Sequence, residues 1–364
     1  MPRKRSDGSH ETRADTPSSE FSKGSDGPSS PDSLSSTEGA ASSESDADQP
    51  RPSAKRPITI ALREQMLSQH PVVGGHYTIP TPMLIQAHEE ARDRVWSKRT
   101  GAVFYGKTRT GKSTCAKTVR GYLQEEFPQI YITMASGRRS LRPKEGKMAQ
   151  LILEGSGHVL AKRTDPDLLL RNVILDIQMN VANLGGQQYV LILDEVNLCN
   201  EFDLTSLLEI HNMLAMREIT MTTISFGQPD VLNLINSLIA TEQEQIIARF
   251  FRKPVPFYGC TSEETLKDVL EKLDNETEWP EGSGWTFTYF FFPEAYKTGF
   301  RMSHFAGAIW LALVNATEVQ PFGFTMETIS LLVKGIYVAT RGADRAGMVL
   351  CEEAIATALK ATDI

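Results

Sequence analysis

Short apolar runs alternate with amphipathic stretches through the middle of the chain. Five runs predict strands: 102–105, 129–134, 189–193, 219–226 and 255–258. Six stretches among them have helical spacing: 115–124, 150–160, 167–179, 203–216, 230–238 and 242–251. Strands that are apolar throughout and alternate with helices indicate an α/β fold, with a parallel sheet covered on both faces. Pro256 places the last strand at an edge of this sheet.

The pattern changes on both sides of this region. Residues 58–70 and 83–98 have helical periodicity and are joined by a Pro/Gly connector. The predictions for the C-terminal part are all helical: 262–273, 293–299, 303–316, 325–340 and 351–361. The sequence therefore predicts a nucleotide-binding α/β domain at 56–258 and a small helical lid domain at 259–364.

Residues 1–55 are rich in Ser, Asp, Glu, Gly and Pro and contain almost nothing to bury. Such a segment cannot offset the entropy lost on ordering, so we expect a disordered tail. The cluster Arg3 to Arg5 is expected to be solvated, with contact to DNA or a partner as the alternative.

The chain has 364 residues and a net charge of -7, so nucleic acid would require a local basic patch. The four cysteines are scattered without a CxxC pair, which argues against a zinc site or a disulfide framework and for a reducing compartment. No apolar run approaches the roughly twenty residues of a membrane helix. A secretory signal has an apolar stretch after its first charged residues, and no such stretch follows MPRKRSDGSH here. We expect a cytoplasmic protein without a membrane partner.

The segment GKTRTGKS at 106–113 matches the phosphate-loop pattern GxxxxGK[ST] at every fixed position. The strand before it and the helix after it are the context that this motif requires. Glycines permit the turn, and backbone N–H groups at the helix N-terminus attract phosphate oxygens. Lys112 is expected to reach the β- and γ-phosphates of ATP, and Ser113 to ligate Mg²⁺; the alternative is a Gly-rich turn with an exposed lysine. The residues predicted to bind ATP here are Gly106, Lys107, Thr108, Arg109, Thr110, Gly111, Lys112, Ser113 and Thr114.

Asp194 and Glu195 directly follow YVLIL at 189–193, the most strongly apolar strand in the chain. Ligands of a parallel sheet lie at the carboxyl ends of its strands, so Asp194 is expected beside the phosphate loop. There it would hold Mg²⁺ through the ion's waters, and Glu195 would polarise the attacking water as general base. The alternative is two exposed acids in a turn. A metabolite kinase has no need of a water-activating glutamate, so the pair favours ATP hydrolysis, with Glu195 and Lys112 as catalytic residues.

Other polar residues are candidates for the same reaction. Ser225, or Gln228 just beyond it, is a candidate to orient the water, the alternative being a plain strand end. Arg249 is predicted to reach a neighbouring subunit's γ-phosphate, a contact worth roughly 10³–10⁵ in rate in GTPases. The alternative for Arg249 and Arg252 is a solvated rim around a core anchor. Arg301 is a candidate to close onto the γ-phosphate from the lid.

Together the phosphate loop, YVLILDE, ISFGQPD, the ARF segment and the helical lid resemble an AAA+ ATPase. Within that superfamily, HYTIPTP before a helix that leads into GAVFYGKTRTGKST, together with the GQPD turn, resembles the TniB/TnsC transposition regulators. Gln228 stands where that family tends to have Thr, and its lid glycine pair is present only as Gly299-Phe300.

This resemblance implies an ATP-dependent, bacterial, DNA-associated homo-oligomer, a ring or filament on double-stranded DNA. It implies partners at two faces, a target-selection protein and a DDE transposase. ATP would favour the DNA-bound oligomer and hydrolysis would disassemble it.

In a ring of such subunits, the segment after the second strand faces the central channel. Here it is SGRRSLRPKEGK, with five basic residues and one acid. Basic side chains there would neutralise phosphates and give non-specific, salt-sensitive binding. The alternative is a solvated surface loop. The predicted DNA-binding residues are Arg138, Arg139, Arg142, Lys144 and Lys147.

Three other functions stay open. An AAA+ initiator or helicase loader would share all the nucleotide motifs, and gene neighbourhood would separate it from a transposition regulator. A nucleotide-gated signalling switch would lack a DNA role and would carry sensor repeats. A metabolite kinase would leave Glu195 without a role.

Overall fold

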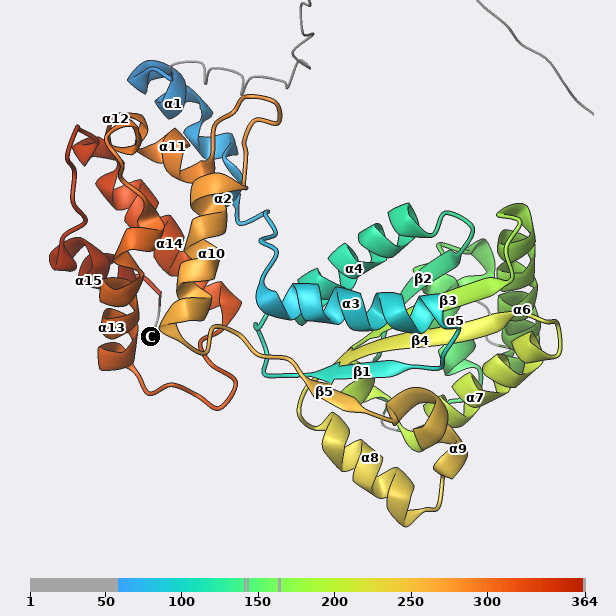
Figure 1. Ribbon diagram of the computed structural model, residues 1–364. Coiled ribbons are helices and arrows are strands. Elements are labelled where there is room, and N and C mark those ends of the chain that lie inside the picture. The colour runs from blue at the N-terminus through green and yellow to red at the C-terminus, as the bar shows by residue number, and fades with distance from the viewer. Residues whose placement is uncertain (1–57, 141, 143, 163–164, 363–364) are drawn as a thin grey trace, which may run out of the picture. The chain divides into compact units, whose positions relative to one another are not determined.

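The computed structural model describes residues 58–362 apart from 141, 143, 163 and 164 (Figure 1). The tail expected at 1–55, with its basic cluster, lies outside the described residues.

The predicted parallel sheet is confirmed. Its strands are β1 Ala102–Tyr105, β2 Tyr131–Ser136, β3 Gln188–Asp194, β4 Thr220–Gly227 and β5 Pro254–Pro256. They pair in the order β2-β3-β4-β1-β5, every pair parallel, with β5 at an edge as predicted. Strand β2 starts two residues later than expected, because Ile130 N donates to Phe127 O in a turn at the end of α4.

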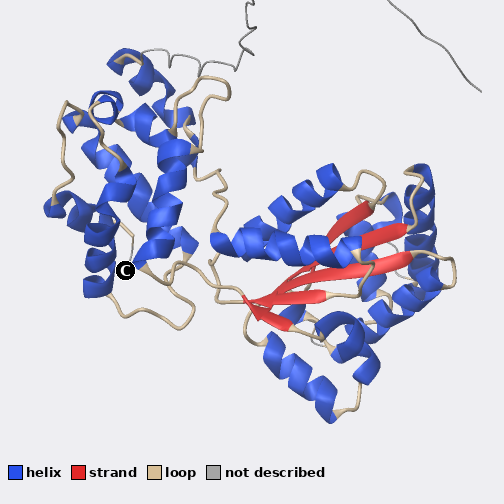
Figure 2. Cartoon of the chain, viewed as in Figure 1, coloured by secondary structure: helices blue, strands red, loops and turns tan. Residues whose placement is uncertain are grey.

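Helices cover both faces of this sheet (Figure 2). On one face lie α3 Pro82–Trp96 and α4 Lys112–Glu126. On the other lie α5 Lys147–Gly155, α6 Pro166–Asn183, α7 Glu201–Ala215 and α8 Val231–Ala240. Along β3, Val190 and Ile192 face the first layer, whereas Leu191 and Leu193 face the second, so the strand is apolar throughout as a sheet buried on both sides requires.

Of the six helices predicted among the strands, two are shorter than expected. The helix predicted at 150–160 ends at Gly155, where a Cβ would lie 2.1 Å from Met134 O, and a 3₁₀ turn Val159–Lys162 follows. The helix predicted at 242–251 is α9 Glu244–Ile246 followed by a π-helical turn Ile247–Phe251. This turn places Phe250 and Phe251 in the core.

The C-terminal region is helical, as predicted. It contains α10 Glu263–Asn275, α11 Phe287–Phe291, α12 Pro293–Lys297, α13 Ala306–Ala316, α14 Met326–Thr340 and α15 Glu352–Lys360. Helix α11 was not predicted, because its sequence FTYFF is aromatic without a polar face. Thr286 caps it by accepting from Tyr289 N at 3.2 Å, and all five residues are buried.

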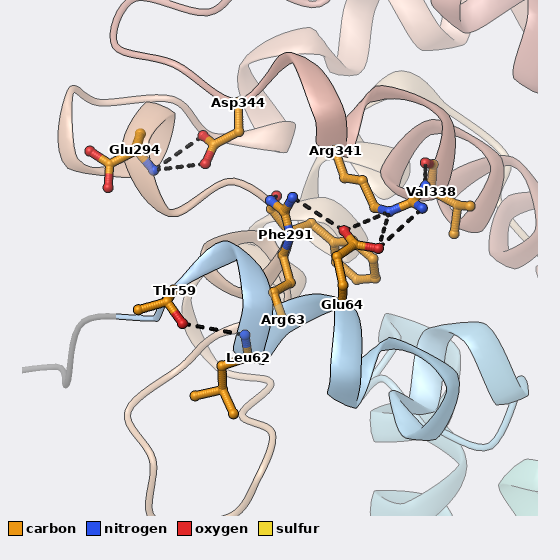
Figure 3. Close-up of polar contacts among 9 residues, drawn as sticks. All are labelled: Thr59, Leu62, Arg63, Glu64, Phe291, Glu294, Val338, Arg341 and Asp344. Atoms are coloured by element: carbon orange, nitrogen blue, oxygen red, sulfur yellow. Dashed lines mark hydrogen bonds and ion pairs between the residues drawn. The ribbon is translucent and has the colours of Figure 1, made fainter.

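The segment before α3 packs with this helical region. It contains α1 Ile60–Met66 and α2 Pro71–Gly74, and its Ile58, Val72 and Ile79 join the apolar cluster of the C-terminal helices. Figure 3 shows two polar contacts that fix α1: Arg63 Nη1 donates to Phe291 O at 2.9 Å, and Glu64 pairs with Arg341 at 3.2 Å. The predicted domain boundary at residue 258 stays a prediction. We propose that residues 58–79 fold with the helical region, because their apolar side chains belong to its core.

Candidate nucleotide-binding site

The phosphate loop begins where β1 passes close to two other segments. Gly106 N donates to Gly227 O of β4 at 3.1 Å. A Cβ on Gly106 would lie 2.2 Å from the carbonyl oxygen of Phe257, closer than real Cβ atoms approach. Only glycine therefore fits at the first position of the loop.

The loop ends in the N-terminus of α4. Gly111 is the N-cap of this helix with φ 98°, a conformation that glycine adopts readily. The Thr110 hydroxyl donates to Lys107 O at 2.8 Å and closes the turn. Helix α4 therefore starts at the loop with free N–H groups, the arrangement that binds phosphate.

Lys112 lies in the first turn of α4 and is only 5% exposed. Its ammonium donates to Gly106 O at 2.9 Å and to Lys107 O at 2.7 Å. Burial lowers the pKa of Lys112, while the carboxylates of Glu195 and Asp194 act in the opposite direction. Both acids therefore lie close enough to feel the lysine charge at the mouth of the loop.

Asp194 and Glu195 leave β3 in different environments. Asp194 is buried, and its Oδ1 accepts from Glu195 N at 3.0 Å. Glu195 has φ 52°, which turns it out of the strand to line the cavity described below. The Ser113 hydroxyl and the Asp194 carboxylate are oxygen donors of the kind that Mg²⁺ prefers, so the residues fit that ion.

Of the two candidates at the carboxyl end of β4, Ser225 and Gln228, it is Gln228 that contacts Glu195. Gln228 Nε2 donates to Glu195 Oε2 at 3.3 Å, and Gln228 N donates to Asn197 Oδ1 at 2.9 Å. Ser225 pairs in register with Leu193, so its side chain lies on the opposite face of the sheet from Asp194. Its hydroxyl is buried without a hydrogen-bond partner among the described residues. Ser225 is not among the described residues that line the cavity at the phosphate loop.

A cavity of about 540 Å³ opens at the phosphate loop, and we call it the phosphate-loop cavity. This volume is in the range of small-molecule sites. One wall is residues 108–115 with Glu195. The other wall comes from the connector and the helical region; its members include Tyr77, Ile79, Leu273, Met326 and Ser330.

Sequence reasoning missed this second wall as a binding surface. The Tyr77 hydroxyl lies 2.8 Å from Ser330 Oγ, and burial raises the pKa of Tyr77. These two residues are 253 positions apart, so their contact leaves no local pattern. The one local signal was the apolar and aromatic run HYTIP inside a Pro/Gly connector.

Arg109 crosses from one wall to the other. It has φ 63°, and its guanidinium lies 3.0 Å from the carboxylate of Glu327 in the first turn of α14. Both side chains are largely solvent-exposed, so the pair contributes little energy. It places one positive and one negative charge at the rim of the phosphate-loop cavity.

The two predicted arginines outside the loop lie elsewhere. Arg301 is not among the described residues that line the phosphate-loop cavity. Its guanidinium stacks 3.5 Å from the Tyr296 ring centroid and donates to Phe300 O at 2.7 Å, which occupies it within the helical region. Arg249 is half-buried in the π-helical turn, where its carbonyl accepts from Gly101 N at 2.7 Å. Its role toward a neighbouring subunit stays a prediction.

The basic segment after β2 is divided by the structure. Arg138, Arg139, Arg142 and Lys144 are exposed, with Arg138 paired to Glu154 at 2.9 Å. The prediction that Lys147 binds DNA is wrong. Its side chain is 7% exposed, and its ammonium pairs with the fully buried Asp203 at 2.6 Å. A buried, paired ammonium cannot reach a DNA phosphate. Four of the five predicted DNA-binding residues therefore remain candidates.

Comparisons with known proteins agree with this fold. A family model described as "AAA domain" matches residues 94–235. The chain is similar to the ORC2 protein of Aeropyrum pernix solved with ADPNP and ADP, with TM-score 0.54 and 14% identity over 81% of this chain and 72% of that one. The ADP form of that protein gives TM-score 0.52 and 15% identity, over 79% and 71% of the chains. No curated protein matches the sequence. Over the described residues, every helix is too short or too polar to span a bilayer.

These findings establish the fold class: an AAA domain over residues 94–235, with a five-stranded parallel sheet between helices, followed by a helical region.

Proposed function

We propose that this protein is an AAA+ ATPase that assembles on double-stranded DNA with ATP, links target selection to a transposase, and is released by hydrolysis. The observation that carries the ATPase part is the phosphate-loop cavity, which brings the loop, Lys112 and Glu195 to one space. An ATP phosphate chain needs such a loop, and water attack needs such a carboxylate.

Nucleotide binding uses the two walls in different ways. Residues 106–114 would hold the phosphates through backbone N–H groups and the Lys112 ammonium. The apolar second wall, with Tyr77 and Met326, would take the base and ribose, since such surfaces bury flat apolar groups. Mg²⁺ held by Ser113 and Asp194 would neutralise phosphate charge.

Hydrolysis would be carried by Glu195. Its carboxylate lines the phosphate-loop cavity and accepts a proton from water as the water attacks. Gln228 is the residue that holds this carboxylate, through its hydrogen bond at 3.3 Å. We propose that Arg249 from a neighbouring subunit supplies positive charge to the γ-phosphate, so that turnover depends on assembly.

The DNA part of the proposal rests on Arg138, Arg139, Arg142 and Lys144. These exposed cations follow β2 in a protein with a net charge of -7. Positive charge on one loop of an acidic protein favours a local contact with a polyanion.

The test is binding of the full chain to duplex DNA with ATP, with ADP and without nucleotide, followed by imaging of the complexes. Lys112→Ala should abolish ATP-dependent assembly, and Arg138→Ala with Arg139→Ala and Arg142→Ala should abolish DNA association. A matched triple variant at Lys98, Arg99 and Arg217 removes the same charge from exposed residues that precede β1 and β4. We expect it to bind DNA normally. ATP turnover without DNA association at low salt would favour a signalling switch instead.

The likeness to an ORC2 protein supports a second candidate, an initiator-type ATPase. The two functions share the site and differ in the machine that the assembly receives. Purified assemblies on DNA distinguish them: a transposition regulator directs insertion by the transposase of its gene neighbourhood, whereas an initiator recruits a helicase and leaves insertion unchanged.

A further inference from the structure

The basic loop 138–147 is joined at both ends to the segment that carries Glu195. We infer that this loop controls the position of Glu195, so that what occupies the loop sets the rate of hydrolysis, with Lys147 as the positioning residue. This inference rests on the proposed ATPase activity.

The first attachment is at Gly137, where β2 ends. Gly137 N donates to Asp194 O at 2.7 Å. A Cβ on Gly137 would lie 2.3 Å from Glu195 O and 3.3 Å from Cys199 Sγ. The backbone that starts the basic loop therefore lies directly against the backbone of Glu195.

The second attachment is Lys147, where the loop enters α5. Its ammonium pairs with Asp203 Oδ2 at 2.6 Å, and the two side chains are 7% and 0% exposed. The same oxygen accepts from Asn200 N at 3.1 Å, and Asn200 Oδ1 accepts from Asp203 N at 2.9 Å. Lys147 thus holds the capping box that starts α7.

A short turn connects that capping box to Glu195. Leu198 N donates to Glu195 O at 2.9 Å, and Cys199 N donates to Val196 O at 3.0 Å. Glu195 is therefore fixed between Gly137 on one side and the Asn200 cap on the other. A displacement of the loop would therefore be transmitted through these contacts to Glu195, whose carboxylate lines the phosphate-loop cavity.

Stability alone does not explain the ion pair. A buried pair gives up its hydration, and apolar residues of the same volume often stabilise as well. Asp203 Oδ1 is also buried without a hydrogen-bond partner among the described residues. A directional contact of this kind fixes the relative position of two segments, which is what coupling requires.

The first experiment is hydrogen exchange of the full chain with ADPNP and with ADP. Amides of 144–150 lie outside the cavity lining, yet coupling predicts that their exchange changes between the two nucleotides by about threefold or more, together with amides of 196–200. The turn 184–187, at the amino ends of the strands, should not change. A response confined to the residues that line the cavity overturns the inference.

The second experiment measures kcat and KM for ATP, with and without duplex DNA. Lys147→Met keeps a side chain of similar length and removes its charge. We expect kcat to change by about tenfold and KM by less than about twofold. Lys147→Arg should restore part of the difference. Lys267→Met is the matched control, an exposed lysine that pairs with Glu271 on α10 and lies outside the loop and the cavity lining, and it should turn over ATP like the unmodified protein.

The outcomes separate this inference from the proposed function. In one outcome the unmodified protein binds DNA and hydrolyses ATP while Lys147→Met keeps the same kcat and the same response to DNA. That result contradicts the coupling and leaves the proposed function intact. Unmodified protein without turnover contradicts the ATPase, while the exchange experiment still decides the coupling. If Lys147→Met does not fold, Lys147→Arg and the exchange data of the unmodified protein give the answer.

Discussion

The two walls of the phosphate-loop cavity differ in what fixes their shape. The wall of 108–115 is fixed by backbone: Gly106, which starts the loop, has no room for a Cβ beside the Phe257 carbonyl, and Gly111 has a positive φ. The second wall is fixed by side chains from distant segments, such as Tyr77 against Ser330. The two glycines of the phosphate loop should not tolerate a side chain, whereas the second wall should tolerate substitutions that keep its volume.

The largest effect is expected at Gly106. Gly106→Ala places a methyl carbon 2.2 Å from Phe257 O, so the loop must shift, and we expect nucleotide affinity to fall at least about 100-fold. Nucleotide titration by fluorescence measures this. Gly121→Ala is the control: it lies in α4 with nothing within 4 Å of its Cβ, and it should raise stability by up to about 1 kcal/mol. Normal affinity in Gly106→Ala would show that the loop is not fixed by its backbone.

The next effect concerns the helical region and its dependence on pH. His70 is fully buried, its Nδ1 accepts from Val72 N, and its ring lies 4.9 Å from that of Trp279. Burial lowers the pKa of His70 to about 3. Below pH 6.5 the unfolded chain binds a proton that the folded chain refuses, so stability falls between pH 6.5 and about 3. The slope from this group is at most about 1.4 kcal/mol per pH unit.

Denaturant unfolding at pH 7.5 and at pH 5.5 measures this loss. His70→Asn keeps a capping side chain for α2 and removes the titration, so its stability should depend less on pH than that of the unmodified protein. Equal slopes for the two proteins would assign the acid sensitivity to other groups.

The part of the site that could be predicted from the sequence is the part formed by consecutive residues. The phosphate loop, Asp194 and Glu195 are consecutive residues whose chemistry needs a local backbone, so a motif is enough to find them. Lys147 was assigned to DNA because its neighbours are basic, but its partner Asp203 is 56 positions away and makes it a core residue. Tyr77 was left in a connector for the same reason.

The carboxyl end of β4 shows what the periodicity of a strand can predict and what it cannot. The polar residues Ser225 and Gln228 were both candidates, and alternation along a strand assigns a face only when the register with its neighbour is known. The pairing of Ser225 with Leu193 turns its hydroxyl away from the site, and Gln228 lies beyond the strand, where a loop returns it to Glu195.

This difference predicts opposite results at the two positions. Gln228→Ala removes the hydrogen bond that holds Glu195, and we expect kcat for ATP to fall about tenfold with nearly unchanged nucleotide affinity. Ser225→Ala removes a buried hydroxyl without a partner among the described residues, and kcat should stay within about twofold. Steady-state kinetics at several ATP concentrations separates the two. A larger loss in Ser225→Ala than in Gln228→Ala would reverse the assignment.

The smallest effect is expected where the walls meet, at Arg109 and Glu327. Their ion pair is exposed, and such pairs contribute about 0.2–1 kcal/mol, so neither change should unfold the protein. Both side chains line the cavity, where the phosphates of a bound nucleotide would bring negative charge. Glu327→Gln should therefore raise ATP affinity about twofold to threefold, and Arg109→Ala should lower it by a similar factor. Raising the salt concentration should shrink both effects. In the double variant the two changes should largely cancel if each acts through charge alone. A double variant as weak as Arg109→Ala would instead mean that Arg109 contacts the nucleotide itself and that Glu327 only orients it.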